Sequence, residues 1–235
     1  MYIYKLQRRT TTPHPSTLTP TEQPVTIQNE EISLTFDANG LVSTLTEKAT
    51  NVTHTFRQEF FYYLGVMNGS QPSGAYVFRP EGKPIPIEKA QLEVVKFIND
   101  ESLRDPITKE VVTRYITDIK NQDVFFTDAN GRQMMRRQKN YNPSFKYVDT
   151  EPVAGNYYPV TNRVFLKDDN KQLTILTDRS QGASSVDGGL ELMLHRRCFA
   201  DDHWGVEEAL DEPGDGSGLV VRGTHYVLFG DTKVD

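Results

Sequence analysis

The sequence predicts an all-β protein, a large antiparallel β-sandwich with few or no helices. First, many short segments alternate between apolar and polar residues with a period of two, which is the pattern of a half-buried strand. Second, Gly, Asn, Asp and Pro stand between these segments, as expected of turns. Third, hardly any window carries the 3.6-residue apolar stripe of a helix. Because an α/β fold needs helices between its strands, the pattern favours a sandwich.

The clearest strand covers residues 32–36. Ile32, Leu34 and Phe36 lie on one face of it, with hydroxyl side chains on the other. The turn residues 37–40 end the strand, so we expect a hairpin into residues 41–45. By the same pattern, further strands are predicted at residues 59–66, 75–78, 92–98, 111–119, 124–126, 163–166, 173–176, 190–197 and 219–229.

The chain begins with a separate strand. Residues 2–6 alternate, and a segment dominated by Thr, Pro and Ser, typical of a linker, follows them. A single strand before a linker cannot bury its own face, so we expect it to complete the sheet of a preceding domain that is absent here. The predicted organisation is the last strand of a preceding small β domain (1–8), a Thr/Pro-rich linker (9–26) and a C-terminal β-sandwich domain (27–235).

Charge and hydropathy exclude several classes of partner. The formal net charge is -6 and the isoelectric point is near 5.4, which disfavours nucleic acid and anionic membranes. No stretch approaches the roughly 20 apolar residues of a membrane span. Asn51 and Asn68 each begin an N-glycosylation triplet and are candidate glycan sites, whereas the triplet at Asn142 is excluded by its proline.

Side chains that could bind a metal are present but poorly spaced. Asp201, Asp202 and His203 form a polar cluster, and four acidic residues follow downstream. The cluster matches no EF-hand loop or HExxH helix, and the five histidines are scattered. We therefore expect a solvated loop in which the aspartates make turns, and no metal bound by this chain. Cys198 is alone in the sequence, so no internal disulfide forms, and we expect it to be buried.

The predicted strand 190–197 carries an unusual arginine. Alternation places Arg196 on the face of Leu190, Leu192 and Leu194, with Glu191 on the opposite face. A guanidinium group on a buried face needs a partner, either a carboxylate or sugar hydroxyls. A structural ion pair and a substrate contact both remain open.

Several segments together resemble the C-terminal region of lysosomal-type α-mannosidases, members of glycoside hydrolase family 38. They are residues 73–80 (SGAYVFRP), 125–132 (FFTDANGR), 151–160 (EPVAGNYYPV), 173–180 (LTILTDRS) and 190–197 (LELMLHRR). The resemblance implies a galactose-mutarotase-like supersandwich. It also implies a parent protein that is a retaining, exo-acting hydrolase of terminal α-linked mannose on N-glycan-type oligosaccharides. In that family zinc and the nucleophile belong to an N-terminal α/β barrel, which this chain lacks.

The resemblance also suggests site residues and partners. Tyr76 and Arg196 match positions that resemble substrate-contacting ones, and Arg197 is the alternative match for the arginine. The implied partners are the catalytic barrel of the same protein and a mannose-containing oligosaccharide, and the implied location is the lysosome or the secretory pathway. The chain alone is predicted to be inactive. A second hypothesis is a free-standing β-sandwich that binds sugar or protein without catalysis.

Overall fold

The computed structural model describes residues 2–5, 24–38, 40–87, 90–92, 96–98, 106–148, 150–214, 216 and 218–232. These residues form strands and loops, with one short 3₁₀ turn, η2, at Ala154–Asn156. The all-β prediction is confirmed. Every strand pairing among the described residues is antiparallel.

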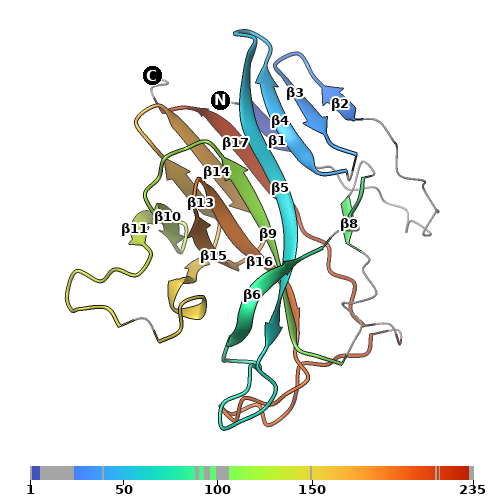
Figure 1. Ribbon diagram of the computed structural model, residues 1–235, viewed down its shortest axis with the longest axis vertical. Coiled ribbons are helices and arrows are strands. Elements are labelled where there is room, and N and C mark those ends of the chain that lie inside the picture. The colour runs from blue at the N-terminus through green and yellow to red at the C-terminus, as the bar shows by residue number, and fades with distance from the viewer. Residues whose placement is uncertain are drawn as a thin grey trace.

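Two sheets form the sandwich (Figure 1). The nine-stranded sheet has the order β12 (Tyr158–Val160), β15 (Gln181–Val186), β16 (Gly189–Arg197), β9 (Lys109–Thr117), β5 (Val52–Gly65), β4 (Val42–Glu47), β3 (Ile32–Phe36) and β2 (Val25–Gln28), and β6 (Pro80–Pro86) also pairs with β5. The six-stranded sheet has the order β1 (Tyr2–Lys5), β17 (His225–Asp231), β14 (Lys171–Thr177), β13 (Arg163–Lys167), β10 (Val124–Ala129) and β11 (Gln133–Gln138). A separate hairpin joins β7 (Ala90–Leu92) and β8 (Lys96–Ile98).

The main hydrophobic core lies between the two sheets. The six-stranded sheet contributes side chains such as Phe125, Leu173 and Ile175, and the nine-stranded sheet contributes Leu190 and Leu192, all fully buried. Alternation along each strand explains this, because every second residue points to the facing sheet. A smaller apolar cluster around Phe60, Tyr62 and Ile87 covers the far part of β5, which runs along most of the molecule (Figure 1).

The predicted alternation is confirmed where apolar residues define it. Ile32, Leu34 and Phe36 are buried in β3. Three predicted strands are wrong: residues 75–78 form a loop, the single strand expected at residues 92–98 is divided between β7 and β8, which pair with each other, and the last strand begins at residue 225 rather than 219. The backbone amides of residues 76 and 77 bond to a side-chain carboxylate instead of a neighbouring strand, which is why no strand forms there.

The N-terminal strand belongs to the sandwich in this structure. β1 pairs with β17 at the edge of the six-stranded sheet, in a register from Tyr2 opposite Phe229 to Lys5 opposite Tyr226. The division into residues 1–8, 9–26 and 27–235 stays a prediction, and this pairing counts against assigning residues 1–8 to a preceding domain. Residues 9–23 of the predicted linker lie outside the described residues, whereas residues 25 and 26, which the prediction also assigned to the linker, belong to β2.

A β-bulge in β16 overturns one expectation. The pairing with β9 shifts between Met193 and His195, so Leu194 has no partner and the alternation changes phase. Arg196 pairs with Glu110, and it therefore lies on the face of Glu191 rather than on the face of Leu190 and Leu192. The prediction that Arg196 shares the leucine face is wrong, because strict alternation does not continue through a bulge.

Candidate functional site

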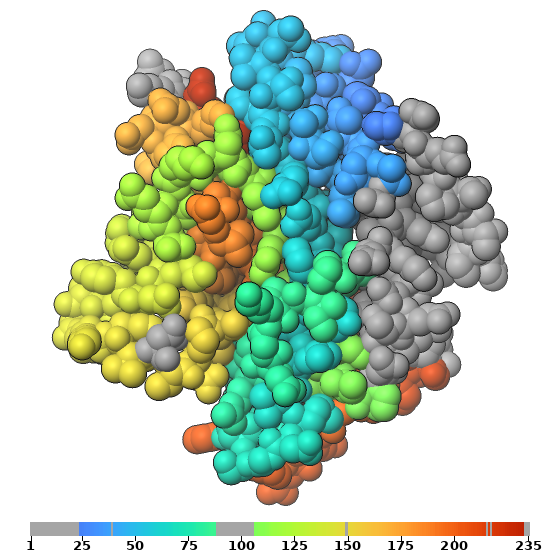
Figure 2. All heavy atoms as spheres, viewed as in Figure 1, coloured from blue at the N-terminus to red at the C-terminus, as the bar shows by residue number. Residues whose placement is uncertain are grey.

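Two loops meet at the end of the nine-stranded sheet where β5 leads into β6. We call residues 66–79, between β5 and β6, and residues 198–212, after β16, the tip loops. They form the lower end of the molecule, teal and orange in Figures 1 and 2. Gln71 joins them twice, since its amide donates to the Asp202 carbonyl at 2.9 Å and accepts from the Trp204 indole at 2.8 Å.

Asp202 organises the first tip loop. Its Oδ2 accepts hydrogen bonds from the backbone amides of Tyr76 at 2.5 Å and Val77 at 2.7 Å, and its Oδ1 accepts from the amide of Trp204 at 3.2 Å. Burial raises the pKa of Asp202, but the bonds from these three amides outweigh burial and hold the pKa below its usual value. Asp202 is therefore an ionised acceptor that shapes a turn, as expected, but the expectation of a solvated loop is wrong for this residue, which is 1% exposed.

Gly74 lets the two tip loops approach closely. A Cβ atom at this position would lie 2.6 Å from the Asp202 amide nitrogen and 2.7 Å from its Cβ. Real side chains do not reach such distances, so only glycine fits without displacing Asp202. Packing against the second tip loop thus explains why Gly74 stands in the segment 73–80, one of those that carry the family resemblance.

Arg196 fastens the same loop from the sheet. Its Nη2 donates to the carbonyl oxygen of Gly74 and approaches that of Val77 at 3.4 Å. Its Nε lies 3.5 Å from Oε2 of Glu110, a residue of β9. The structure thus brings Arg196 together with the loop of Tyr76, although the two are far apart in the sequence. Of the two kinds of partner that the sequence left open for Arg196, a carboxyl group is the one that the structure shows, in Glu110.

Tyr76 is an exposed residue of the same loop. Its backbone is bonded to Asp202, while the residue as a whole is 65% exposed. Trp204, on the second loop, is 64% exposed. The tip loops therefore present two aromatic side chains on a backbone held by Arg196 and Asp202.

Arg197 has a different environment from Arg196. Its Nε donates to Oδ1 of Asp211 at 2.5 Å, and its guanidinium lies 4.7 Å from the centre of the Phe199 ring. The register of β16 places it on the face opposite Arg196. Arg197 is thus engaged within the second tip loop.

A buried carboxylate lies on the outer face of the nine-stranded sheet. Glu191 is 2% exposed, and it accepts bonds from Arg114 Nε at 2.5 Å, from the Tyr63 hydroxyl at 3.0 Å and from the Tyr157 hydroxyl. Burial, followed by the charge of Glu191, raises the pKa of Tyr63, so the phenol keeps its proton. Sequence reasoning placed Glu191 on this face but missed its partners, which come from three distant segments.

Phe78 connects this cluster to the tip loops. Its ring meets the rings of Tyr63 and Tyr157 edge-on, with centroids 5.9 Å and 5.6 Å away. Edge-to-face contacts of this kind stabilise by roughly 0.5 to 1.5 kcal/mol beyond burial. The first tip loop is therefore anchored at three places: Phe78, Arg196 and Asp202.

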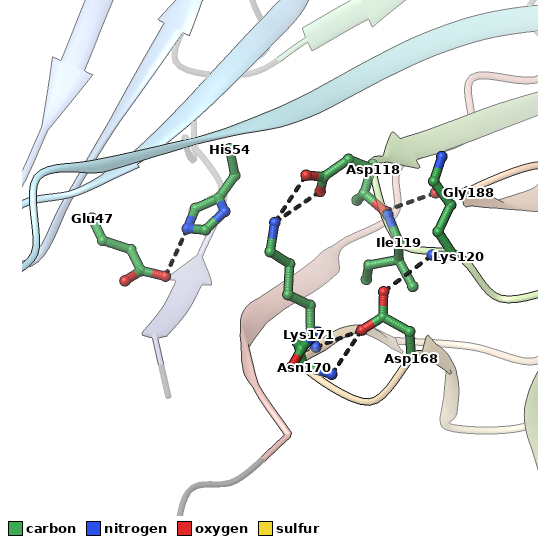
Figure 3. A network of polar contacts seen from close by, with 10 residues as sticks. Glu47, His54, Asp118, Ile119, Lys120, Asp168, Asn170, Lys171 and Gly188 are labelled. Carbon is green, nitrogen blue, oxygen red and sulfur yellow. Dashed lines mark hydrogen bonds and ion pairs between the residues drawn. The ribbon is translucent and has the colours of Figure 1, made fainter.

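A second polar network lies at the opposite end of β9 and has a structural character (Figure 3). Lys171 bonds both carboxylate oxygens of Asp118, and His54 bonds Glu47 at 3.0 Å. Asp168 accepts from the backbone amides of Lys120, Asn170 and Lys171. The Lys171 and Asp168 contacts tie the β13–β14 turn to the end of β9, and the His54 contact joins β5 to β4.

The two candidate glycan sites are exposed. Asn51 lies in the β4–β5 turn with a left-handed φ of 54°, and Asn68 lies in the first tip loop. Cys198 is fully buried, as expected, and burial raises the pKa of its thiol.

Residues 27–108 and 99–204 match the model of the glycosyl hydrolases family 38 C-terminal domain. The chain belongs to this family. It is 40% identical over 244 residues to the lysosomal alpha-mannosidase of Homo sapiens, covering 87% of this chain and 24% of that protein. It is 32% identical over 231 residues to the lysosomal alpha-mannosidase of Dictyostelium discoideum, covering 80% of this chain and 23% of that one.

The fold of this family 38 domain also matches a solved structure. An alpha-mannosidase from Enterococcus faecalis V583 superposes with a TM-score of 0.57 at 14% identity, over 90% of this chain and 30% of the other. At this identity the match supports the fold alone. The chain spans about a quarter of the length of the curated relatives it matches.

The described part of this family 38 domain offers no group of three or more His, Cys, Asp or Glu side chains that could hold a metal ion. A zinc ion implied by the resemblance thus finds no fitting ligand set among these residues. Within the same residues no helix is long and apolar enough to cross a membrane.

Proposed function

We propose that the chain is the C-terminal, non-catalytic region of an exo-acting, retaining α-mannosidase that removes terminal α-linked mannose from N-glycan-type oligosaccharides. Retaining hydrolysis uses two carboxyl groups, a nucleophile and an acid/base, on either side of the glycosidic bond. In this proposal both groups, and zinc, belong to an N-terminal α/β barrel outside this chain. The relatives support it, because they are about four times as long as the matched region and are named alpha-mannosidases.

The contribution of this chain is the loop that carries Tyr76. The observation that carries the proposal is that Tyr76 is 65% exposed while its own backbone amide is bonded to the buried Asp202. A loop fixed before the ligand arrives loses little conformational entropy on binding. A tyrosine offers an apolar ring and a hydroxyl together, which suits a sugar that has both apolar and hydroxyl surfaces.

The two arginines take different parts in this proposal. Arg196 contacts the carbonyls of Gly74 and Val77, so it supports the loop from below and orients Tyr76. Arg197 is bonded to Asp211 and supports the second tip loop. The location we propose is the lysosome or the secretory pathway, with Asn51 and Asn68 as glycan sites; the relatives' names and the exposure of both asparagines support this.

A graft tests the proposal. Residues 2–232, which include β1 and the whole of β2, replace the matching C-terminal region of the human relative, and the purified graft is assayed on an aryl α-mannoside. Substituting Tyr76→Ala should lower kcat/KM by roughly ten- to a hundredfold, because about 1.5 to 3 kcal/mol of transition-state stabilisation is lost. Tyr141→Ala is the matched control, since Tyr141 is 52% exposed on another loop. Equal kinetics for the two variants would refute the role of Tyr76.

A further inference from the structure

Glu110 is a buried carboxyl with an incomplete set of partners. It lies in β9, between Tyr63 of β5 and Arg196 of β16 in the sheet. The residue is 4% exposed, and its Oε2 has no hydrogen-bond partner among the described residues. The nearest cation is Arg196, whose Nε is 3.5 Å away, too far for a good hydrogen bond. A carboxylate in this position is only weakly compensated.

Arg196 lies between two carboxyl groups that differ in their support. On one side Asp202 receives three backbone amides, and burial together with these bonds leaves its pKa lowered. On the other side, Glu110 receives no backbone amide among the described residues. Burial raises the pKa of Glu110 to about 8, although the positive charge of Arg196 acts in the opposite direction and lowers it. The positive charge of Arg196 therefore acts on two carboxyl groups: Asp202, which is ionised, and Glu110, which readily takes up a proton.

The groups facing Glu110 come from every element packed against it. They are Tyr63 from β5, Arg196 from β16, Cys198 just after β16, Tyr157 before β12 and, beyond Arg196, Asp202. The two phenols and the thiol are neutral, because burial raises the pKa of each. The charge on Glu110 therefore acts chiefly on Arg196.

Hydrogen bonds connect Arg196 directly to the backbone of the first tip loop. Its guanidinium bonds the carbonyls of Gly74 and Val77, on either side of Tyr76. Gly74 packs against Asp202, which in turn accepts the Trp204 amide. The guanidinium thus contacts the backbone that carries Tyr76, and that backbone packs against the loop that carries Trp204.

We propose that Glu110 is a positioning residue for the tip loops, acting through Arg196. When Glu110 is neutral, Arg196 interacts with the carbonyls of Gly74 and Val77 and with the charge of Asp202, so the first tip loop is held in place. When Glu110 is ionised, it attracts the guanidinium toward β9 and weakens the hydrogen bonds from Arg196 to the first tip loop. The importance of this for substrate rests on the function proposed above, but the effect on the loops does not.

Trp204 provides the reporter, because it is the single tryptophan of the sequence and its indole N–H donates to Gln71. The indole-ring ¹H–¹³C peak of the ¹³C-labelled 235-residue chain is followed from pH 6 to pH 10, without sugar, because ring C–H protons do not exchange with water. The wild-type peak should shift with a midpoint within about one unit of pH 8. In Glu110→Gln, which mimics the neutral form, that transition should vanish and the peak should stay at its low-pH position.

Two further variants keep the test decisive. Glu208→Gln makes the same chemical change at an exposed carboxyl near Trp204 and should titrate like the wild type. If Glu110→Gln fails to fold, Arg196→Lys replaces it: a lysine has no planar fork to reach both carbonyls, so the shift should fall by at least half.

The proposal is overturned if the wild-type peak does not move, or if Glu110→Gln or, in its place, Arg196→Lys titrates like the wild type. The titration contains no sugar, so it tests the positioning role of Glu110 separately from substrate binding. If the Trp204 peak titrates as expected but the Tyr76→Ala graft is fully active, the positioning role stands and only the substrate role of the tip loops is rejected.

Discussion

At the scale of single residues, Leu192 shows what holds the two sheets together. It is fully buried in the core between them and pairs with Thr113 across β9. Leu192→Ala should lower the free energy of unfolding by roughly 2 to 5 kcal/mol, because apolar contacts are lost and a cavity remains. Urea unfolding measures this. Leu219→Ala is the matched control, since Leu219 is 51% exposed, and it should change stability by less than about 0.5 kcal/mol. Equal costs would contradict the core assignment.

Glu191 shows where prediction from single residues stops. Alternation correctly separates it from Leu192, because the period of two is a local property of the strand. Its burial depends on Tyr63, Arg114 and Tyr157, which reach it from other parts of the chain. No local pattern in the sequence specifies such a meeting, so the carboxylate cluster could not be predicted.

At the scale of elements, the bulge in β16 separates the roles of two adjacent arginines. Arg196→Ala leaves Glu110 without its nearest cation and the Gly74 carbonyl without its donor, and we expect it to cost about 1 to 3 kcal/mol of stability. Arg197→Ala removes a more exposed ion pair with Asp211 and should cost about 1 kcal/mol or less. Paired urea titrations compare the two. A greater loss for Arg197→Ala would show that the register of β16 has been misassigned.

Strands with a strong apolar alternation could be predicted, and those without it could not. β3, β14 and the first half of β16 follow the pattern and were expected. β6 is an exposed strand that contains prolines, and β15 is built from small and polar residues, so neither has the signal. Residues 75–78 show the opposite error, a strand-like pattern that forms a loop. Their apolar residues bond to Asp202 or pack against the aromatic cluster, and they do not pair with a neighbouring strand.

At the scale of the whole molecule, the candidate site depends on tertiary structure. Tyr76 and Arg196 were singled out by resemblance to a family, whereas the physical argument from alternation placed Arg196 on the wrong face. Their proximity arises because β5 and β16 both pair with β9 and end on the same side of the sheet. Such a pairing is non-local, and sequence spacing alone does not determine it.

In the function proposed above, this chain supports substrate recognition while the chemistry lies elsewhere in a longer protein. The most direct measurement compares hydrolysis of an aryl α-mannoside by the purified 235-residue chain and by the graft at equal molar concentration, with zinc content determined after dialysis. We predict turnover and bound zinc for the graft and neither for the chain alone. Sustained hydrolysis that follows the chain through two chromatographic columns, or a folded graft without activity, would contradict the account.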